Sequence, residues 1–120
     1  MAKVLIVDDM ASMRKMVSFT LESVGHDVVQ ACDGDEALNV AKGGSFDLVI
    51  TDVNMPNMNG LALTAELRKL SSFKFTPILL LTTEAGQDKK MQGKAAGATG
   101  WLVKPFDPDK LLMTIKRVLR

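Results

Sequence analysis

The sequence is short of cysteine, of aromatic residues and of excess charge. Its one cysteine, Cys32, excludes an internal disulfide and a zinc site built on cysteines. Its 15 Lys and Arg against 14 Asp and Glu leave a net charge of +1, which provides no general basic field for nucleic-acid binding. The apolar runs are too short to cross a bilayer, and the first residues lack a signal-peptide core. We therefore expect a cytoplasmic protein that binds neither nucleic acid nor a membrane.

The chain has 120 residues, of which 47% are hydrophobic and 24% charged, and we expect residues 1–120 to form one globular domain. Short runs that are apolar at every position are typical of strands buried on both faces of a parallel sheet. Val4–Val7 and Ile78–Leu81 are of this kind. In all, five short and mainly apolar runs alternate with segments of helical spacing, which predicts an α/β fold with a doubly wound sheet. The expected strands are Val4–Val7, Val28–Ala31, Leu48–Ile50, Ile78–Leu81 and Trp101–Val103.

Capping residues mark the ends of several expected helices. Asp33 followed by Glu36 resembles a capping box, and Asp107 before Pro108 places an N-cap ahead of a proline at the first helical position. The first helix is expected to end at Gly25. Its apolar face consists of Met13, Val17, Leu21 and Val24.

One expected helix, from about Gly86 to Ala96, is weak. Gly86 and Gly93 each lower its helix propensity by about 1 kcal/mol relative to Ala.

Polar side chains follow four of the five expected strands. Asp8 and Asp9 follow the first strand, and Asp52 follows the third. Thr82 follows the fourth strand and Lys104 follows the fifth. The carboxyl ends of parallel strands share one edge of the sheet, where doubly wound folds bind their ligands. We therefore expect these five side chains to meet.

Three carboxylates at one edge repel one another unless a cation joins them. Their oxygens suit Mg²⁺, which takes one or two carboxylates, waters and a phosphate oxygen. With the Lys104 ammonium and the Thr82 hydroxyl, the set forms a site for a phosphoryl group. The sequence has no P-loop and no G-x-G-x-x-G after the first strand, so a bound nucleotide is not expected. A carboxylate can itself accept the phosphoryl group, and Asp52, which follows the expected central strand, is the best candidate.

These residues lie within a wider set of motifs. The motifs are Val7–Met10 with Met13 and Arg14, Asp52 with Asn54–Gly60, Leu81–Ala85, Ala96–Ala98 and Lys104–Phe106. Together they resemble the receiver domains of two-component response regulators, and within that family the single-domain, CheY-like chemotaxis type. The likeness covers nearly the whole chain. It implies a flavodoxin-like (βα)5 fold with a five-stranded parallel sheet in the order 2-1-3-4-5.

The resemblance also implies a role for each site residue. Asp52 would accept the phosphoryl group from a chemotaxis-type histidine kinase in an Mg²⁺-dependent reaction, in which Mn²⁺ could substitute. The metal would be held by the carboxylates of Asp9 and Asp52 and by the backbone carbonyl of Asn54. Asp8 would act mostly through metal-bound water. Lys104 would pair with the phosphoryl oxygens.

According to the same resemblance, phosphorylation changes a surface and is then reversed. Thr82 would turn toward the phosphoryl group, and Trp101 would follow from an outward to an inward rotamer. This would alter the surface of the fourth helix, fifth strand and fifth helix. Asn54 and Glu84 would tune dephosphorylation. The chain would thus be a regulatory phosphoacceptor and not an enzyme, although phosphotransfer and autodephosphorylation would be self-catalysed.

The output partner has more than one candidate. The sequence stops just after the fifth expected helix, so we expect output through contact with a protein target and not with DNA. The flagellar motor switch is one such target. However, Lys89, Lys90 and Gly93 stand where motor-binding relatives tend to have an apolar contact. A non-flagellar chemosensory regulator or a phosphate sink is therefore an alternative.

Two other classes of protein share parts of this pattern. An aspartate-nucleophile, Mg²⁺-dependent phosphohydrolase of the haloacid dehalogenase type carries D-x-D-x-[TV] after its first strand, whereas this chain has adjacent Asp8 and Asp9. It remains a remote alternative. A flavodoxin-like electron carrier needs a phosphate loop and aromatic stacking, and this chain has no Tyr and one Trp.

Overall fold

The computed structural model describes residues 2–55, 58–82, 87–104 and 107–119. The strands are β1 (Lys3–Val7), β2 (Asp27–Ala31), β3 (Leu48–Asp52), β4 (Ile78–Thr82) and β5 (Gly100–Val103). The helices are α1 (Ala11–Glu22), α2 (Gly34–Lys42), α3 (Gly60–Arg68), α4 (Gln87–Ala96) and α5 (Pro108–Val118), with a 3₁₀ turn at Ser71–Phe73.

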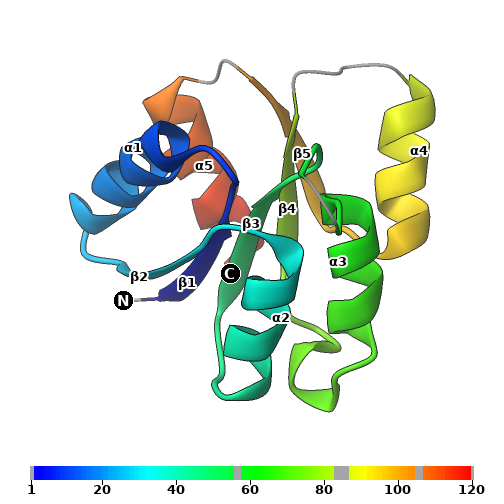
Figure 1. The fold of residues 1–120 in the computed structure, drawn as a ribbon. Helices are drawn as coiled ribbons and strands as arrows, with labels where there is room; N and C mark the ends of the chain where they lie inside the picture. The colour runs from blue at the N-terminus through cyan, green and yellow to red at the C-terminus, as the bar shows by residue number, and fades with distance from the viewer. Residues whose placement is uncertain (1, 56–57, 83–86, 105–106, 120) are drawn as a thin grey trace.

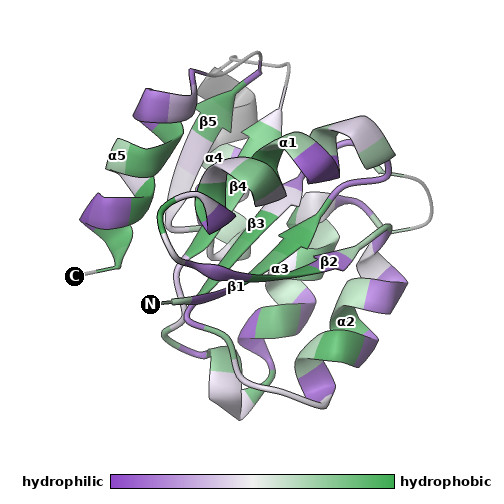
Figure 2. Cartoon of the chain, turned by 90° about the vertical axis from the view of Figure 1, so that its left-hand side faces the viewer, coloured by the Kyte–Doolittle hydropathy of each residue, from purple (hydrophilic) through white to green (hydrophobic). Residues whose placement is uncertain are grey.

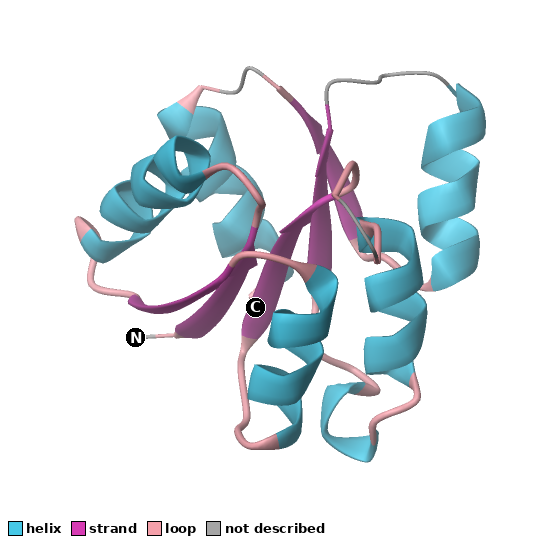
Figure 3. Ribbon diagram, in the orientation of Figure 1, coloured by secondary structure: helices cyan, strands magenta, loops and turns pink. Residues whose placement is uncertain are grey.

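The strands form one parallel sheet in the order β2-β1-β3-β4-β5 (Figure 1). Helices α1 and α5 cover one face, and α2, α3 and α4 cover the other (Figure 3). The expected α/β class, the doubly wound sheet and the strand order implied by the resemblance are therefore confirmed. Across the described ranges, no helix is long and apolar enough to cross a membrane.

The central strands are buried because both faces of the sheet are covered. All five residues of β3 and of β4 are buried, and Figure 2 shows that these strands are mostly hydrophobic. Successive side chains of a strand point to opposite faces. Accordingly, Val4 and Ile6 pack in the core beneath α1 and α5, whereas Leu5 and Val7 pack in the core beneath α2 and α3. Runs that are apolar at every position thus supply both cores at once.

The expected N-caps are present in the structure. Asp33 Oδ1 accepts a hydrogen bond from the Glu36 N–H at 2.8 Å, and the Asp107 carboxylate accepts one from the Asp109 N–H at 3.0 Å. In a capping box the N3 side chain accepts a second hydrogen bond, from the N–H of the N-cap residue. Here Glu36 Oε1 accepts instead from the N–H of Cys32, one residue before the N-cap, at 3.0 Å. Side chains thus satisfy backbone donors that each helix leaves free.

The first helix ends earlier than its apolar pattern predicts. It stops at Glu22, so Val24 lies beyond the helix and is 42% exposed, and its expected place on the buried face is wrong. The chain must reverse here to enter β2, and the Val24 N–H closes that turn on the Leu21 carbonyl. The helix thus ends before Gly25, contrary to expectation, and Gly25 lies in the turn that follows, where its φ of 91° favours glycine.

Arg68, at the end of α3, joins segments that the sequence does not show to be neighbours. Its guanidinium donates to the Gly97 carbonyl at 3.0 Å, to the Phe73 carbonyl at 2.7 Å and to the Thr76 carbonyl at 2.6 Å. Gly97 follows α4, and the other two carbonyls precede β4. One planar cation therefore fastens the turn after α4 to the turn after α3.

Replacing Arg68 with Met should lower the free energy of unfolding by about 2–4 kcal/mol, because partly buried carbonyls lose their donors. Chemical denaturation monitored by circular dichroism measures this change. The matched control is Lys69→Met at the next position, whose exposed ion pair with Glu66 should be worth at most about 1 kcal/mol. Equal losses in the two variants would contradict the role given to Arg68.

Candidate functional site

Three carboxylates meet at the carboxyl edge of the sheet, as the sequence predicts. Asp8 and Asp9 follow β1, and Asp52 is the last residue of β3. One oxygen from each lies within 4.8 Å of the others. Asp8 is 2% and Asp52 is 6% exposed, whereas Asp9 is exposed to solvent. The cluster thus has two buried members and one member open to an incoming ion.

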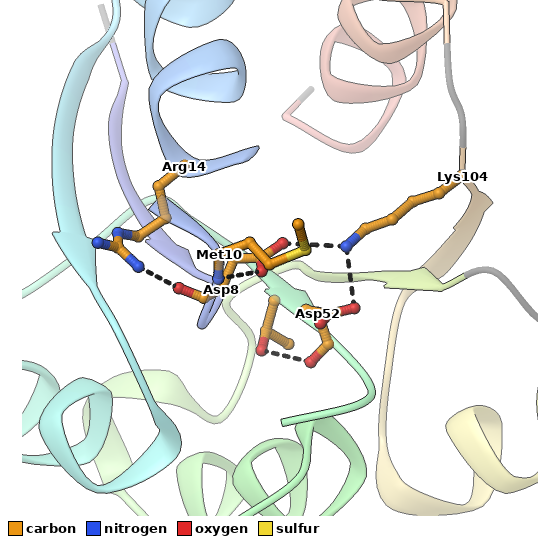
Figure 4. Close-up of polar contacts among 6 residues, drawn as sticks. Asp8, Met10, Arg14, Asp52 and Lys104 are labelled. Atoms are coloured by element: carbon orange, nitrogen blue, oxygen red, sulfur yellow. Dashed lines mark hydrogen bonds and ion pairs between the residues drawn. The ribbon is translucent and has the colours of Figure 1, made fainter. Parts of the chain in front are cut away.

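The position of Asp8 is fixed by its neighbours on three sides (Figure 4). Its Oδ1 accepts from the Met10 N–H at 2.9 Å, and its backbone carbonyl accepts from Arg14 Nη1 at 2.6 Å. Its own N–H donates to the Ala31 carbonyl at the end of β2. These bonds hold the turn that carries Asp8 and Asp9 against both β2 and the first turn of α1.

Lys104 reaches across the edge of the sheet to two of the carboxylates (Figure 4). Its Nζ lies 3.0 Å from Asp8 Oδ2 and 3.1 Å from Asp52 Oδ1, and its side chain is 9% exposed. The Lys104 N–H donates to the Thr82 carbonyl at 2.7 Å, which ties the base of this side chain to the end of β4. One ammonium faces three carboxylates, so negative charge is in excess.

Burial and charge shift the proton affinities of this cluster. Burial is the largest influence on Asp52 and raises the pKa of its carboxyl; the hydrogen bond from Lys104 opposes this shift without cancelling it. Burial by itself would lower the pKa of Lys104, but its hydrogen bonds to Asp8 and Asp52 outweigh that effect and raise it. The ionised Asp52 carboxylate is therefore destabilised by burial and favours an approaching cation.

The backbone of Asp52 packs against residues of α3 that the sequence analysis did not identify as part of the site. A Cβ on Gly60 would lie 2.2 Å from the Asp52 carbonyl oxygen, so only glycine fits there. The Gly60 N–H donates to the Val53 carbonyl at 2.9 Å, and Thr64 Oγ1 donates to the Gly60 carbonyl at 2.7 Å. The available signal was a glycine placed directly after Asn59, the N-cap of α3. Helix α3 thus packs directly on the strand end that carries Asp52.

The other expected site residues have different surroundings. Thr82 is buried as the last residue of β4, next to Asp52 in the sheet register, in which Asp52 pairs with Leu81. Asn54 is exposed beyond the end of β3. Trp101 is half-buried on β5 and its ring lies against α4. Glu84 lies outside the described residues.

The donor set fits a hard divalent cation. Carboxylate oxygens are the ligands that Mg²⁺ and Mn²⁺ prefer, and Mg²⁺ keeps several waters. Asp9 is the member most open to such an ion, and Asp8 and Asp52 supply buried oxygens beside it. These residues could therefore hold Mg²⁺ together with a phosphoryl oxygen.

Comparison with protein families gives one consistent match. A family model described as the response regulator receiver domain matches residues 4–116. The chemotaxis protein CheY of Pseudomonas aeruginosa is 37% identical over 97% of this chain and 94% of its own length. The probable transcriptional regulator ycf27 of Porphyridium aerugineum is 39% identical over 98% of this chain but 48% of its own length. The chain thus spans about half the length of the ycf27 relatives that it matches.

Solved structures show the same likeness. The chemotaxis protein CheY4 of Vibrio cholerae superposes with a TM-score of 0.96 at 57% identity, covering 99% of both chains. The receiver domain of the sensor histidine kinase PA1611 from Pseudomonas aeruginosa has a TM-score of 0.91 at 27% identity, covering 98% of this chain and 97% of that one. In that protein a magnesium ion is coordinated in the active-site cleft.

Replacing Lys104 with Met should tighten Mg²⁺ binding, because the ammonium and the metal compete for the same carboxylates. The expected gain is about 10-fold, since removing a unit charge a few ångströms away is worth more than 1 kcal/mol at an effective dielectric of 20. Isothermal titration calorimetry measures the affinity. Lys110→Met, on the exposed face of α5, is the matched control.

Conversely, Asp9→Asn should weaken Mg²⁺ binding, because it removes a carboxylate from the site. Unchanged affinities in both Lys104→Met and Asp9→Asn would exclude this cluster as the metal site.

Proposed function

The chain belongs to the response regulator receiver domain family, and from this premise we propose that it accepts a phosphoryl group on Asp52 and signals through a protein-binding surface. The observation that carries the proposal is the pairing of Lys104 Nζ with Asp8 at 3.0 Å and Asp52 at 3.1 Å. A nucleophilic carboxylate, a cation for the transferred group and further carboxylates for a metal thus lie side by side.

The proposed reaction is transfer from a phosphohistidine of a chemotaxis-type histidine kinase. A carboxylate oxygen of Asp52 attacks phosphorus, the P–N bond breaks, and the imidazole leaves with the electron pair. Burial favours this oxygen as a nucleophile, because it leaves the carboxylate poorly solvated. Lys104, already within contact distance, offsets the charge on the phosphoryl oxygens.

The metal requirement follows from the charge of the site. We propose that Asp9 and Asp52 ligate Mg²⁺ with the Asn54 carbonyl, while Asp8 acts through metal-bound water. Mn²⁺ would substitute. The ion would supply positive charge against which a second anion can approach the carboxylates. Magnesium in the active-site cleft of the PA1611 receiver domain supports this part of the proposal.

The proposed output surface is formed by α4, β5 and α5. Large apolar side chains are exposed on all three, with exposed fractions of 62% for Met91, 38% for Val103 and 64% for Met113. In this proposal these three side chains would supply apolar contacts to the partner protein. Thr82 and Trp101 would connect this surface to the phosphoryl group, since Lys104 and Thr82 are joined through the backbone.

The chemotaxis relatives, CheY at 37% identity and CheY4 at 57%, favour a chemosensory role over the other outputs of the family. The partner would be a protein target such as the flagellar motor switch. In this proposal the chain is a regulatory phosphoacceptor that catalyses only its own phosphorylation and dephosphorylation. Asn54, exposed beside the site, and Glu84 would orient the hydrolytic water.

Asp52→Asn should abolish stable labelling, because an amide is a poor nucleophile. The measurement is incorporation of radiolabelled phosphate from acetyl phosphate or a phosphohistidine kinase, with and without Mg²⁺. Asp35→Asn, an exposed carboxylate on α2, serves as the control and should label normally. Labelling that persists in Asp52→Asn would exclude Asp52 as the acceptor. A label that survives for hours in the native protein would contradict the proposed self-catalysed release.

Lys104→Ala should still accept the phosphoryl group but should not transmit its presence to the output surface. The phosphoryl oxygens then lack the cation that ties them to the end of β5. Trp101 is the one tryptophan, so its emission reports the surface change when acetyl phosphate and Mg²⁺ are added. Emission should change in the native protein and in Lys110→Ala, and stay constant in labelled Lys104→Ala. A normal emission change in that variant would show that Lys104 is not the link.

A further inference from the structure

Gly93 is an unusual residue for the middle of α4. Apart from proline, glycine is the least favourable residue in a helix interior, because it has the most conformational freedom to lose. A special backbone conformation does not explain it, since the positive φ values among the described glycines belong to Gly25 and Gly97. The absence of a side chain at Gly93 must therefore matter for packing.

Side chains of the sheet already fill the space that a side chain at Gly93 would need. A Cβ on Gly93 would lie 2.9 Å from Leu80 Cδ1, and 2.9 Å and 3.0 Å from Cζ3 and Cε3 of Trp101. Non-bonded carbon atoms pack at about 3.5–4.0 Å. Leu80 and Trp101 are register partners on β4 and β5. The bare backbone of α4 thus rests on two neighbouring side chains of the sheet.

The indole of Trp101 is held in this place by shape and not by its polar atom. Its Nε1 is shielded from solvent and has no hydrogen-bond acceptor within the described part of the chain. A buried indole N–H usually has a partner. Leu80 is fully buried, whereas Trp101 is half-buried. When the space at Gly93 is filled, Trp101 is therefore the side chain that can move, and water is available to its N–H if it does.

We propose that Gly93 is a positioning residue for Trp101, because its missing side chain leaves a notch that holds the indole ring between α4 and the sheet. The ring fills the notch beside α4, so a change in the rotamer of Trp101 requires a change in the position of α4, and the reverse. We call this coupling the interlock. The interlock is a property of the unphosphorylated chain. Only its use in relaying a phosphorylation signal rests on the proposed function.

The first test is the emission of Trp101 in Gly93→Ala, measured without phosphoryl donor or Mg²⁺. The added methyl should displace the ring toward solvent, shift the emission maximum to longer wavelength and increase quenching by acrylamide. The control is Gly43→Ala, where a Cβ would meet nothing nearer than 3.9 Å. Emission and quenching that stay equal to those of the native protein in both variants would overturn the proposal.

The second test is a double-variant cycle read by thermal unfolding. Gly93→Ala should lower the melting temperature when Trp101 is present. In a Trp101→Val background the ring is gone and Leu80 gains room to turn, so the same substitution should no longer lower it, since Ala favours the helix. An undiminished loss in that background would overturn the proposal. If Gly93→Ala alone does not fold, recovery of folding in the double variant supports the interlock, and failure to recover refutes it. Neither test involves Asp52 labelling, so a failure of the proposed function would be seen separately.

Discussion

The ammonium of Lys104 lies between the buried carboxylates of Asp8 and Asp52 and thereby joins the ends of β5, β1 and β3. Without a cation these two carboxylates would repel one another strongly, because both side chains are almost fully shielded from water. With the ammonium in place the repulsion is reduced but not removed, because Asp9 adds a third carboxylate to the cluster. The edge of the sheet is thus poised to bind positive charge and, once neutralised, an anion.

The parts of the site that carry the carboxylates have little freedom to shift. Gly60 packs closely against the carbonyl of Asp52, and Arg14 donates a hydrogen bond to the carbonyl of Asp8 at 2.6 Å. The ends of β1 and β3 are therefore held in place and would move little in response to a change of charge at the cluster. In the proposed function the effect of that change would fall instead on Lys104 and on the end of β4, which are connected by the backbone hydrogen bond from the Lys104 N–H to the Thr82 carbonyl. This asymmetry favours the β4–β5 side as the route of the proposed signal.

Helix α4 is attached to that side in two physically different ways. At its C-terminal end, Arg68 binds the Gly97 carbonyl and holds the following turn through a charged hydrogen bond. In its middle, contact with the sheet depends on the fit of the Trp101 ring to Gly93. A hydrogen bond of fixed geometry keeps one end in place, whereas a packing contact depends on the rotamer of one side chain. The helix thus combines an anchor with an adjustable contact, next to a surface that exposes Met91.

Local pattern was sufficient for the fold class and for most of the site. Short, mainly apolar runs identified the strands, and capping residues such as Asp33 and Asp107 identified helix starts. Parallel strands carry the residues at their ends to one edge, which brought Asp8, Asp52 and Lys104 together. The roles of Arg68, Gly60 and Gly93 could not be predicted in this way. Each acts through a contact with a different element or turn of the fold, and a glycine or arginine looks the same in the sequence whether or not that contact is present. Only the tertiary structure decided which backbone carbonyl, strand end or indole ring lies against each of these residues. The physical reason is that such contacts depend on how whole helices and strands pack, which no local sequence pattern encodes.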